Sequence, residues 1–134
     1  MIDGAAEAVE HLAGRWPLGV ASSSNRPIIE LLLELSGLAR FLSVTVSSEE
    51  VARGKPAPDV YLEAAKRLDV EPTACAAVED SHNGILSAKA AGMRVLAIPN
   101  RLYPPDEDAL AAADEVLGSI EELTPERVDP ELDT

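Results

Sequence analysis

The 134-residue sequence is poor in cysteine, in aromatic side chains and in positive charge. Its single cysteine, Cys75, cannot form a disulfide within the chain, which fits a reducing compartment. An aromatic content of 3% argues against a stacking platform for bases or sugars. No apolar run approaches the roughly 20 residues that a membrane-spanning helix needs. The N-terminal stretch lacks the basic start and apolar core of a signal peptide, so we expect a cytoplasmic protein.

The charge balance restricts the partners further. There are 24 acidic and 11 basic residues, and the net charge is -13. Binding to nucleic acid through a basic face is therefore not expected, and an anionic membrane would repel the chain. A small anionic ligand would need a local cation, either a metal ion or a focused lysine or arginine.

The sequence has enough apolar residues, 46%, for one globular domain. Short apolar runs predict strands, and apolar periodicity predicts helices between them. The predicted strands are 17–22, 43–47, 74–80, 94–99 and, at an edge, 115–119; the predicted helices are 4–15, 25–37, 59–68, 83–91 and 106–113, with Asp3 as a possible cap of the first. Continuous apolar strands that are each followed by a helix indicate an α/β fold with a parallel sheet and right-handed crossovers.

In such sheets ligands bind beyond the carboxyl ends of the strands, and polar side chains follow three of the predicted strands. The first strand ends in Ser22, Ser23, Ser24 and Asn25, which lead into a helix. Hydroxyls and free backbone N–H groups at a helix N-terminus suit a phosphate oxyanion. Serine and asparagine are also the usual helix caps, so a plain cap is the alternative.

The next two strands bring a lysine and a pair of acids. Lys55 lies between Gly54 and Pro56, where it can neutralise a phosphate as a point charge or can be an ordinary surface lysine. Glu79 and Asp80 are oxygen ligands of the kind that Mg²⁺ prefers, although Asp80 can also cap the following helix. Together, a hydroxyl, a lysine and an acid pair at successive strand ends predict phosphoryl chemistry.

The segments VASSSN, GKPAPDVYLEAAKRL and VEDSHNGILSAKAAGM resemble motifs of the haloacid dehalogenase (HAD) superfamily, in the branch that holds beta-phosphoglucomutase and sugar-phosphate phosphatases. The resemblance implies a three-layer, Rossmann-like core and Mg²⁺-dependent phosphatase or phosphomutase activity on small phosphorylated metabolites. It implies that Ser22, Ser23, Asn25 and Lys55 bind phosphate, that Lys55 is also catalytic, and that Glu79 and Asp80 bind Mg²⁺. Residues 1–123 would form a partial core, and we expect 124–134 to be an acidic, frayed tail.

The first motif of that family has no counterpart in the sequence. In the family it is a strand that ends in two aspartates two residues apart, the first of which is the nucleophile; here the only acid in a remotely similar setting is Asp3. The resemblance implies a strand order of 5-4-1-2-3, so the central strand and the inserted cap domain would be missing. Without the nucleophile, we expect little or no activity from this chain and weak Mg²⁺ binding.

A missing central strand would leave one edge unpaired on each of the strands 18–22 and 76–79. Unmet buried backbone groups cost about 1–3 kcal/mol each. We expect these two strands to pair with each other, or a second copy or another polypeptide to supply a strand, or the gene product to be longer. The alternatives in function are a non-enzymatic phosphate-binding, Mg²⁺-binding or regulatory module, and one half of a split enzyme.

Overall fold

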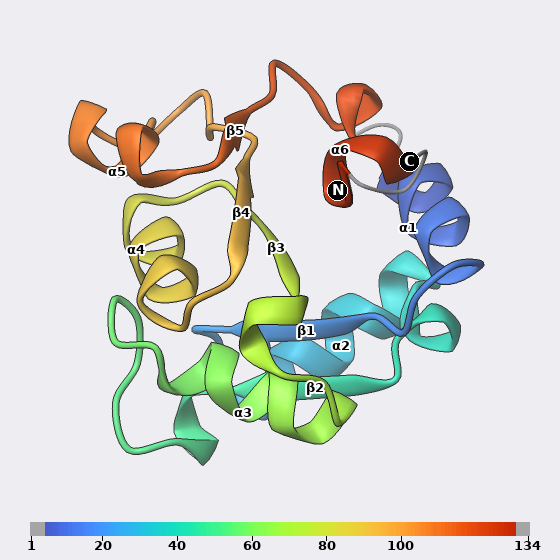
Figure 1. Ribbon diagram of the computed structural model, residues 1–134. Helices are drawn as coiled ribbons and strands as arrows, with labels where there is room; N and C mark the ends of the chain where they lie inside the picture. Colours follow the sequence, from blue (N-terminus) through green and yellow to red (C-terminus); the bar gives the residue numbers. More distant parts are fainter. Residues whose placement is uncertain (1–4, 131–134) are drawn as a thin grey trace.

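The computed structural model describes residues 5–130, in which helices and strands alternate as an α/β fold (Figure 1). The boundaries lie within about two residues of those predicted for most elements, and the predicted helix cap Asp3 lies outside the described residues. The strands are β1 Gly19–Ser22, β2 Val44–Ser47, β3 Ala76–Glu79, β4 Arg94–Ala97 and β5 Glu115–Val116; the α-helices are α1 Ala5–Ala13, α2 Arg26–Ser36, α3 Asp59–Leu68, α4 His82–Ala90, α5 Glu107–Ala112 and α6 Pro125–Val128.

Local signals fix the ends of the helices that flank the strand ends. The side chain of Asn25 accepts a hydrogen bond from the N–H of Ile28 at the start of α2 (3.1 Å), and Gly37 ends that helix with a left-handed φ of 72°. Ser81 begins α4, because its hydroxyl accepts the N–H of Gly84 (3.1 Å). These caps place the first turns of α2 and α4 directly after β1 and β3.

The strands form two parallel sheets, β1–β2 and β3–β4–β5. Of the three alternatives expected for the open edges, the direct pairing of β1 with β3 is therefore wrong. Each pair is fixed by its own helix, since α3 packs on β1 and β2 whereas α4 packs on β3 and β4. The order is the one that the resemblance implies with the central strand left out, and within residues 5–130 no strand lies between β1 and β3.

The facing edges of β1 and β3 pair with no other strand within residues 5–130. The C=O of Leu18 accepts the N–H of Ser43 (2.7 Å) on the β2 side, and the C=O groups of Cys75 and Glu79 accept N–H groups from the β4 side (3.1 and 2.8 Å). Because alternate residues of a strand face opposite neighbours, Ala21 and Val78 direct their backbone groups toward the open edges.

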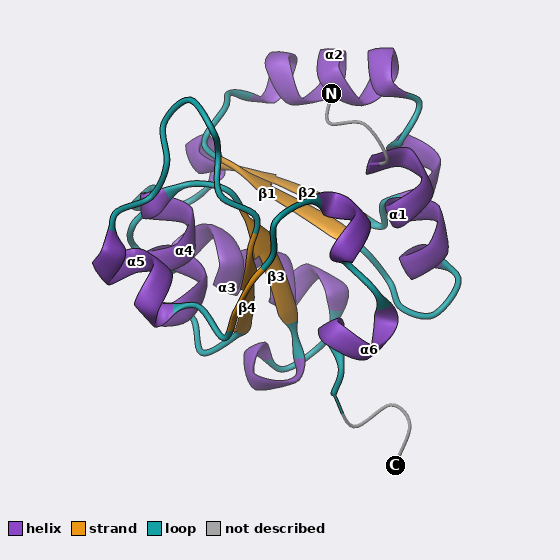
Figure 2. Ribbon diagram, turned by 90° about the horizontal axis from the view of Figure 1, so that it is seen from above, coloured by secondary structure: helices purple, strands orange, loops and turns teal. Residues whose placement is uncertain are grey.

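The main core lies on the side of α3 and α4. Its fully buried apolar side chains come from β2, α3, α4 and β4 and include Val46, Val60, Ile85 and Val95. Figures 1 and 2 show α2 on the opposite face of the β1–β2 pair from α3. The two faces of this pair are therefore covered by different helices, and the better-packed helix is α3.

The expected frayed tail begins instead with a helical turn. Thr124 caps α6, and the guanidinium of Arg94 donates to the C=O of Arg127 (2.9 Å), while Arg127 pairs with Glu115 (3.0 Å). These bonds hold the start of the tail against β4 and β5; residues 131–134 lie outside the described part of the chain. No helix in the described part combines the length and apolar character of a membrane span.

Candidate active site

Lys55 bridges the two sheets at the carboxyl ends of their strands. The residue lies in the loop after β2, and its Nζ donates to Oε2 of Glu79 (2.6 Å) and to the C=O of Ala21 (3.2 Å). The Lys55 side chain is 11% exposed and that of Glu79 is 7% exposed. The predicted lysine and the first of the predicted acids are thus brought together as a largely buried ion pair between β1 and β3.

Tyr61, on α3, joins this pair and was not predicted from the sequence. Its hydroxyl donates to the same Glu79 oxygen, and the Lys55 Nζ lies 5.2 Å from the centre of its ring. Burial and the negative charge of Glu79 raise the pKa of Tyr61 far above its ordinary value, so its hydroxyl remains a donor. The only signal in the sequence was an aromatic residue with a polar end, in the first turns of the helix after Lys55, in a chain with few aromatics.

Gly84 makes room for the carboxylate of Glu79. A Cβ at Gly84 would overlap the Glu79 carboxylate, so only glycine fits this position of α4. The hydroxyl of Ser81 lies 3.4 Å from Oε1 of Glu79. Both oxygens of Glu79 therefore face protein groups, and the carboxylate is enclosed by Lys55, Tyr61 and the start of α4.

The polar residues after β1 are tied into a compact loop. The Ser22 hydroxyl accepts the N–H of Ser24 (3.0 Å), and the C=O groups of Ser23 and Ser24 accept hydroxyls from Ser48 and Ser47 (3.0 and 2.7 Å). Asn25 is the cap of α2, as the alternative interpretation had it. In its described bond the Ser22 hydroxyl acts as an acceptor, so its proton is available to a ligand.

Asp80, in contrast to Glu79, is exposed. Its carboxylate lies 3.5 Å from the side-chain amide of Asn100, which follows β4. It borders a cavity of about 480 Å³ between the loop after β4 and the segment after β5, a cavity that Arg101 also lines. The described residues contain no cluster of three or more histidine, cysteine, aspartate or glutamate side chains that could hold a metal ion. Of the predicted acid pair, only Asp80 offers an open oxygen ligand.

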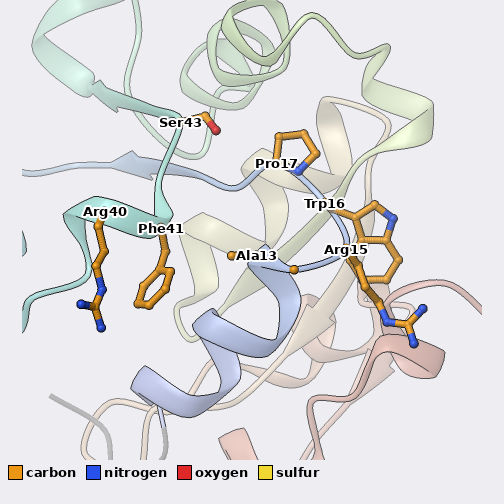
Figure 3. A pocket seen from close by; sticks show the side chains of 8 residues that line it. Ala13, Arg15, Trp16, Pro17, Arg40, Phe41 and Ser43 are labelled. Atoms are coloured by element: carbon orange, nitrogen blue, oxygen red, sulfur yellow. The ribbon is translucent and has the colours of Figure 1, made fainter.

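A second hollow, of about 460 Å³, lies near the amino ends of β1 and β2 (Figure 3). Trp16 and Arg15 lie on one side of it and Phe41 and Arg40 on the other, and the two arginines point away from each other in this view. The guanidinium of Arg40 lies over the Phe41 ring, 4.7 Å from its centre. Because the two cations do not converge, we assign no ligand to this hollow.

Comparisons with known proteins cover most of the chain. A family model described as haloacid dehalogenase-like hydrolase matches residues 1–92. The chain is 39% identical over 128 residues to a bifunctional riboflavin kinase/FMN phosphatase from Arabidopsis thaliana, covering 94% of this chain and 33% of that protein. It is 37% identical over 123 residues to the validoxylamine A 7'-phosphate phosphatase of Streptomyces hygroscopicus subsp. limoneus, covering 91% of this chain and 56% of that protein.

Solved structures show the same fold. The crystal structure of CbbY from Rhodobacter sphaeroides in complex with phosphate has a TM-score of 0.82 at 33% identity, over 91% of this chain and 55% of that one. A beta-phosphoglucomutase from Clostridium difficile has a TM-score of 0.81 at 23% identity, over 97% of this chain and 55% of that one, which is a likeness of fold alone. The chain thus spans between a third and just over half of the lengths of these proteins.

Proposed function

Because the chain belongs to the haloacid dehalogenase-like hydrolases, we propose that it forms the phosphate-binding part of a Mg²⁺-dependent phosphatase or phosphomutase. The proposed substrates are small phosphorylated metabolites such as sugar phosphates. The relatives support this class, since they include phosphatases for FMN and validoxylamine A 7'-phosphate and a CbbY protein in complex with phosphate. A cytoplasmic location remains a prediction from the sequence.

The ion pair of Lys55 is the observation that carries the proposal. An ammonium group has three N–H donors, and the described contacts of Lys55 use two of them, on Glu79 and Ala21. The third donor is available to a phosphate oxygen at the carboxyl ends of the strands. Glu79 compensates the charge of Lys55, so the pair adds no net negative charge at this point of a strongly acidic chain, and the ammonium can still donate to an anion.

In phosphoryl transfer the protein contributes positioning and charge stabilisation. We assign Lys55 the stabilisation of negative charge on the phosphoryl oxygens. Ser22 would donate its free hydroxyl proton to the phosphate, and Ser23 and Asn25 would contribute backbone N–H groups near the start of α2. Glu79 and Tyr61 fix the ammonium in place and are positioning residues in this scheme.

The residues present fit Mg²⁺ only in part. Asp80 is open, but the Glu79 carboxylate is engaged by Lys55 and Tyr61, so we propose that Asp80 alone is the direct ligand from this chain. Mg²⁺ is commonly bound by one or two carboxylates together with substrate phosphate and water. When bound it would neutralise charge on the transferring phosphoryl group.

The nucleophile must come from a further segment under this proposal. The open edges of β1 and β3 face each other across Lys55, and a strand between them would bring its last residues beside the ammonium. Such a strand, supplied by another polypeptide segment, would place an aspartate beside the phosphate. If none binds, the chain is a phosphate-binding module without catalysis.

A hydrolysis assay with Mg²⁺, p-nitrophenyl phosphate and a panel of sugar phosphates tests this proposal. We expect no turnover by the chain alone above that of Asp80→Ala. We expect turnover when the chain is co-expressed with a polypeptide that supplies a strand ending in two aspartates two residues apart, and loss of that turnover in Lys55→Met. Activity of the chain alone that is lost in Asp80→Ala would place the nucleophile within this chain and contradict the proposal. No turnover in either preparation would favour the non-enzymatic module.

A further inference from the structure

Helix α2 carries an apolar stripe that the rest of the described chain does not cover. Ile28, Leu31, Leu32 and Leu35 are 43%, 49%, 57% and 75% exposed. Their spacing of i, i+3, i+4 and i+7 puts them on one side of the helix. Single exposed leucines need no explanation, but four aliphatic side chains in one stripe form the kind of patch that marks an interaction site.

The stripe continues the buried side of the helix and has one acidic rim. With 3.6 residues per turn, Leu32 adjoins Ile29, which is 3% exposed and faces the interior. Glu30 and Glu34 lie beyond Leu31 on the other side, and both are exposed. Neither glutamate has an ion pair within the described residues. A partner on the stripe would therefore extend the core on one side and meet two free carboxylates on the other.

We propose that this stripe binds an amphipathic helix of another polypeptide, with an aliphatic face and lysines or arginines along one rim. An amphipathic helix laid on an apolar surface uses anchors with the same i, i+3, i+4 and i+7 spacing. The basic rim would pair with Glu30 and Glu34, and this complementarity sets the orientation of the bound helix. None of the four stripe residues belongs to the phosphate site, so the inference stands independently of the proposed function.

Charge disfavours the other occupants. In an antiparallel two-fold pairing of α2 with a second copy, the two acidic rims would lie on the same side of the interface, and each copy carries a net charge of -13. An anionic membrane surface would meet the same repulsion. A separate basic helix lacks both penalties.

The test uses two fluorescently labelled synthetic helices on an alanine background. Both carry leucines at i, i+3, i+4 and i+7; one has lysines along one rim and the other has glutamates there. Fluorescence anisotropy is measured with the wild-type chain, with the double variant Leu31→Gln/Leu35→Gln, and with Leu102→Gln as a control. Leu102 is 83% exposed and lies in the loop after β4, outside α2. Circular dichroism verifies that each variant is folded, which we expect because the changed side chains are exposed.

We expect the lysine-rimmed helix to bind at least roughly tenfold more tightly than the glutamate-rimmed one, and Glu30→Lys/Glu34→Lys to reverse this preference. Leu31→Gln/Leu35→Gln should weaken binding by a similar factor, and Leu102→Gln should leave it unchanged. Equal binding of the two helices, binding by neither, or binding that survives the double variant would overturn the proposal. If sedimentation shows a dimer that dissociates in the same double variant, the stripe binds a second copy. If the wild-type chain binds vesicles and the double variant does not, the stripe binds a membrane. Either result also overturns the proposal.

Discussion

Glu79 and Lys55 are each largely shielded from water, so each compensates the charge of the other. Removing one partner of such a buried pair leaves an unpaired charge and typically costs about 3–5 kcal/mol. Two further residues adapt the structure to this pair: Tyr61 donates a hydrogen bond to Glu79, and Gly84 leaves space for its carboxylate. The strand-end rule predicted that both residues lie at the same edge, with Lys55 on phosphate and Glu79 on Mg²⁺, but it did not predict that they pair with each other. It also could not show which residues of α3 and α4 would face Glu79, because that depends on how these helices pack.

The space that Glu79 needs at Gly84 predicts whether a substitution there raises or lowers the stability of the chain. Replacing glycine by alanine inside a helix ordinarily stabilises a protein by up to about 1 kcal/mol. We expect Gly84→Ala to destabilise this chain by about 3 kcal/mol instead, because the new Cβ would displace the Glu79 carboxylate from Lys55. Urea unfolding of Gly84→Ala and of the control Gly14→Ala, whose Cβ would have only ordinary contacts, measures the difference. A Gly84→Ala variant as stable as the control would show that Glu79 does not need this space.

For Tyr61 the prediction concerns alkaline pH. Its pKa is raised in the folded chain, chiefly by burial and then by Glu79, relative to about 10 for an unfolded tyrosine. The folded state therefore holds this proton more tightly, so the stability that Tyr61 contributes is complete below about pH 10 and declines as the pH rises above it. In a Tyr103→Phe background, the absorbance of tyrosinate should appear only as the chain unfolds, followed in parallel by circular dichroism. Tyrosinate formed while the circular dichroism remains that of the folded chain would contradict this assignment.

Among the elements, α2, α3 and the strand cores could be predicted from the sequence because their signals are local: Pro27 and Gly37 bound α2, and apolar runs mark β2 and β4. The pairing of the strands into sheets could not be predicted from the sequence, because it depends on which helix packs on which strands. The predicted β1–β3 pairing failed since α3 and α4 each fix a separate pair. The tail was expected to fray because it is acidic and carries prolines, whereas Arg94, far away in the sequence, binds the C=O of Arg127 at its start.

The two open strand edges predict uneven hydrogen exchange. The N–H groups of Ala21 and Val78 face the gap, whereas those of Val20 and Ala77 face β2 and β4. In amide exchange followed by NMR, Ala21 and Val78 should exchange much faster than their neighbours Val20 and Ala77. Equal protection of all four amides would contradict this prediction and show that the strand edges are covered in solution. If a second copy covers them, dilution of the protein should restore the faster exchange of Ala21 and Val78.

On the scale of the whole molecule, the fold places the Lys55–Glu79 ion pair of an acidic chain where the ends of two separate sheets meet. The family and the parallel strands are those predicted from the sequence, whereas Glu79, predicted as a Mg²⁺ ligand, is bound by Lys55. The chain spans about half the length of most of the relatives it matches. The catalytic segment that the proposal requires would fit between the open edges of β1 and β3. Under the proposal, phosphate binding is the part of the function that this chain would perform by itself.

Titration of the chain with inorganic phosphate in the presence of Mg²⁺, followed by calorimetry, tests that central claim most directly. We predict that the wild-type chain binds phosphate and that Lys55→Met weakens the binding by at least roughly tenfold, since it removes the cation at the strand ends. Lys66→Met is the matched control, because Lys66 is an exposed lysine on α3 outside the site. It should bind phosphate as the wild type does. A wild-type chain that does not bind phosphate, or a folded Lys55→Met variant that binds it equally well, would contradict the account.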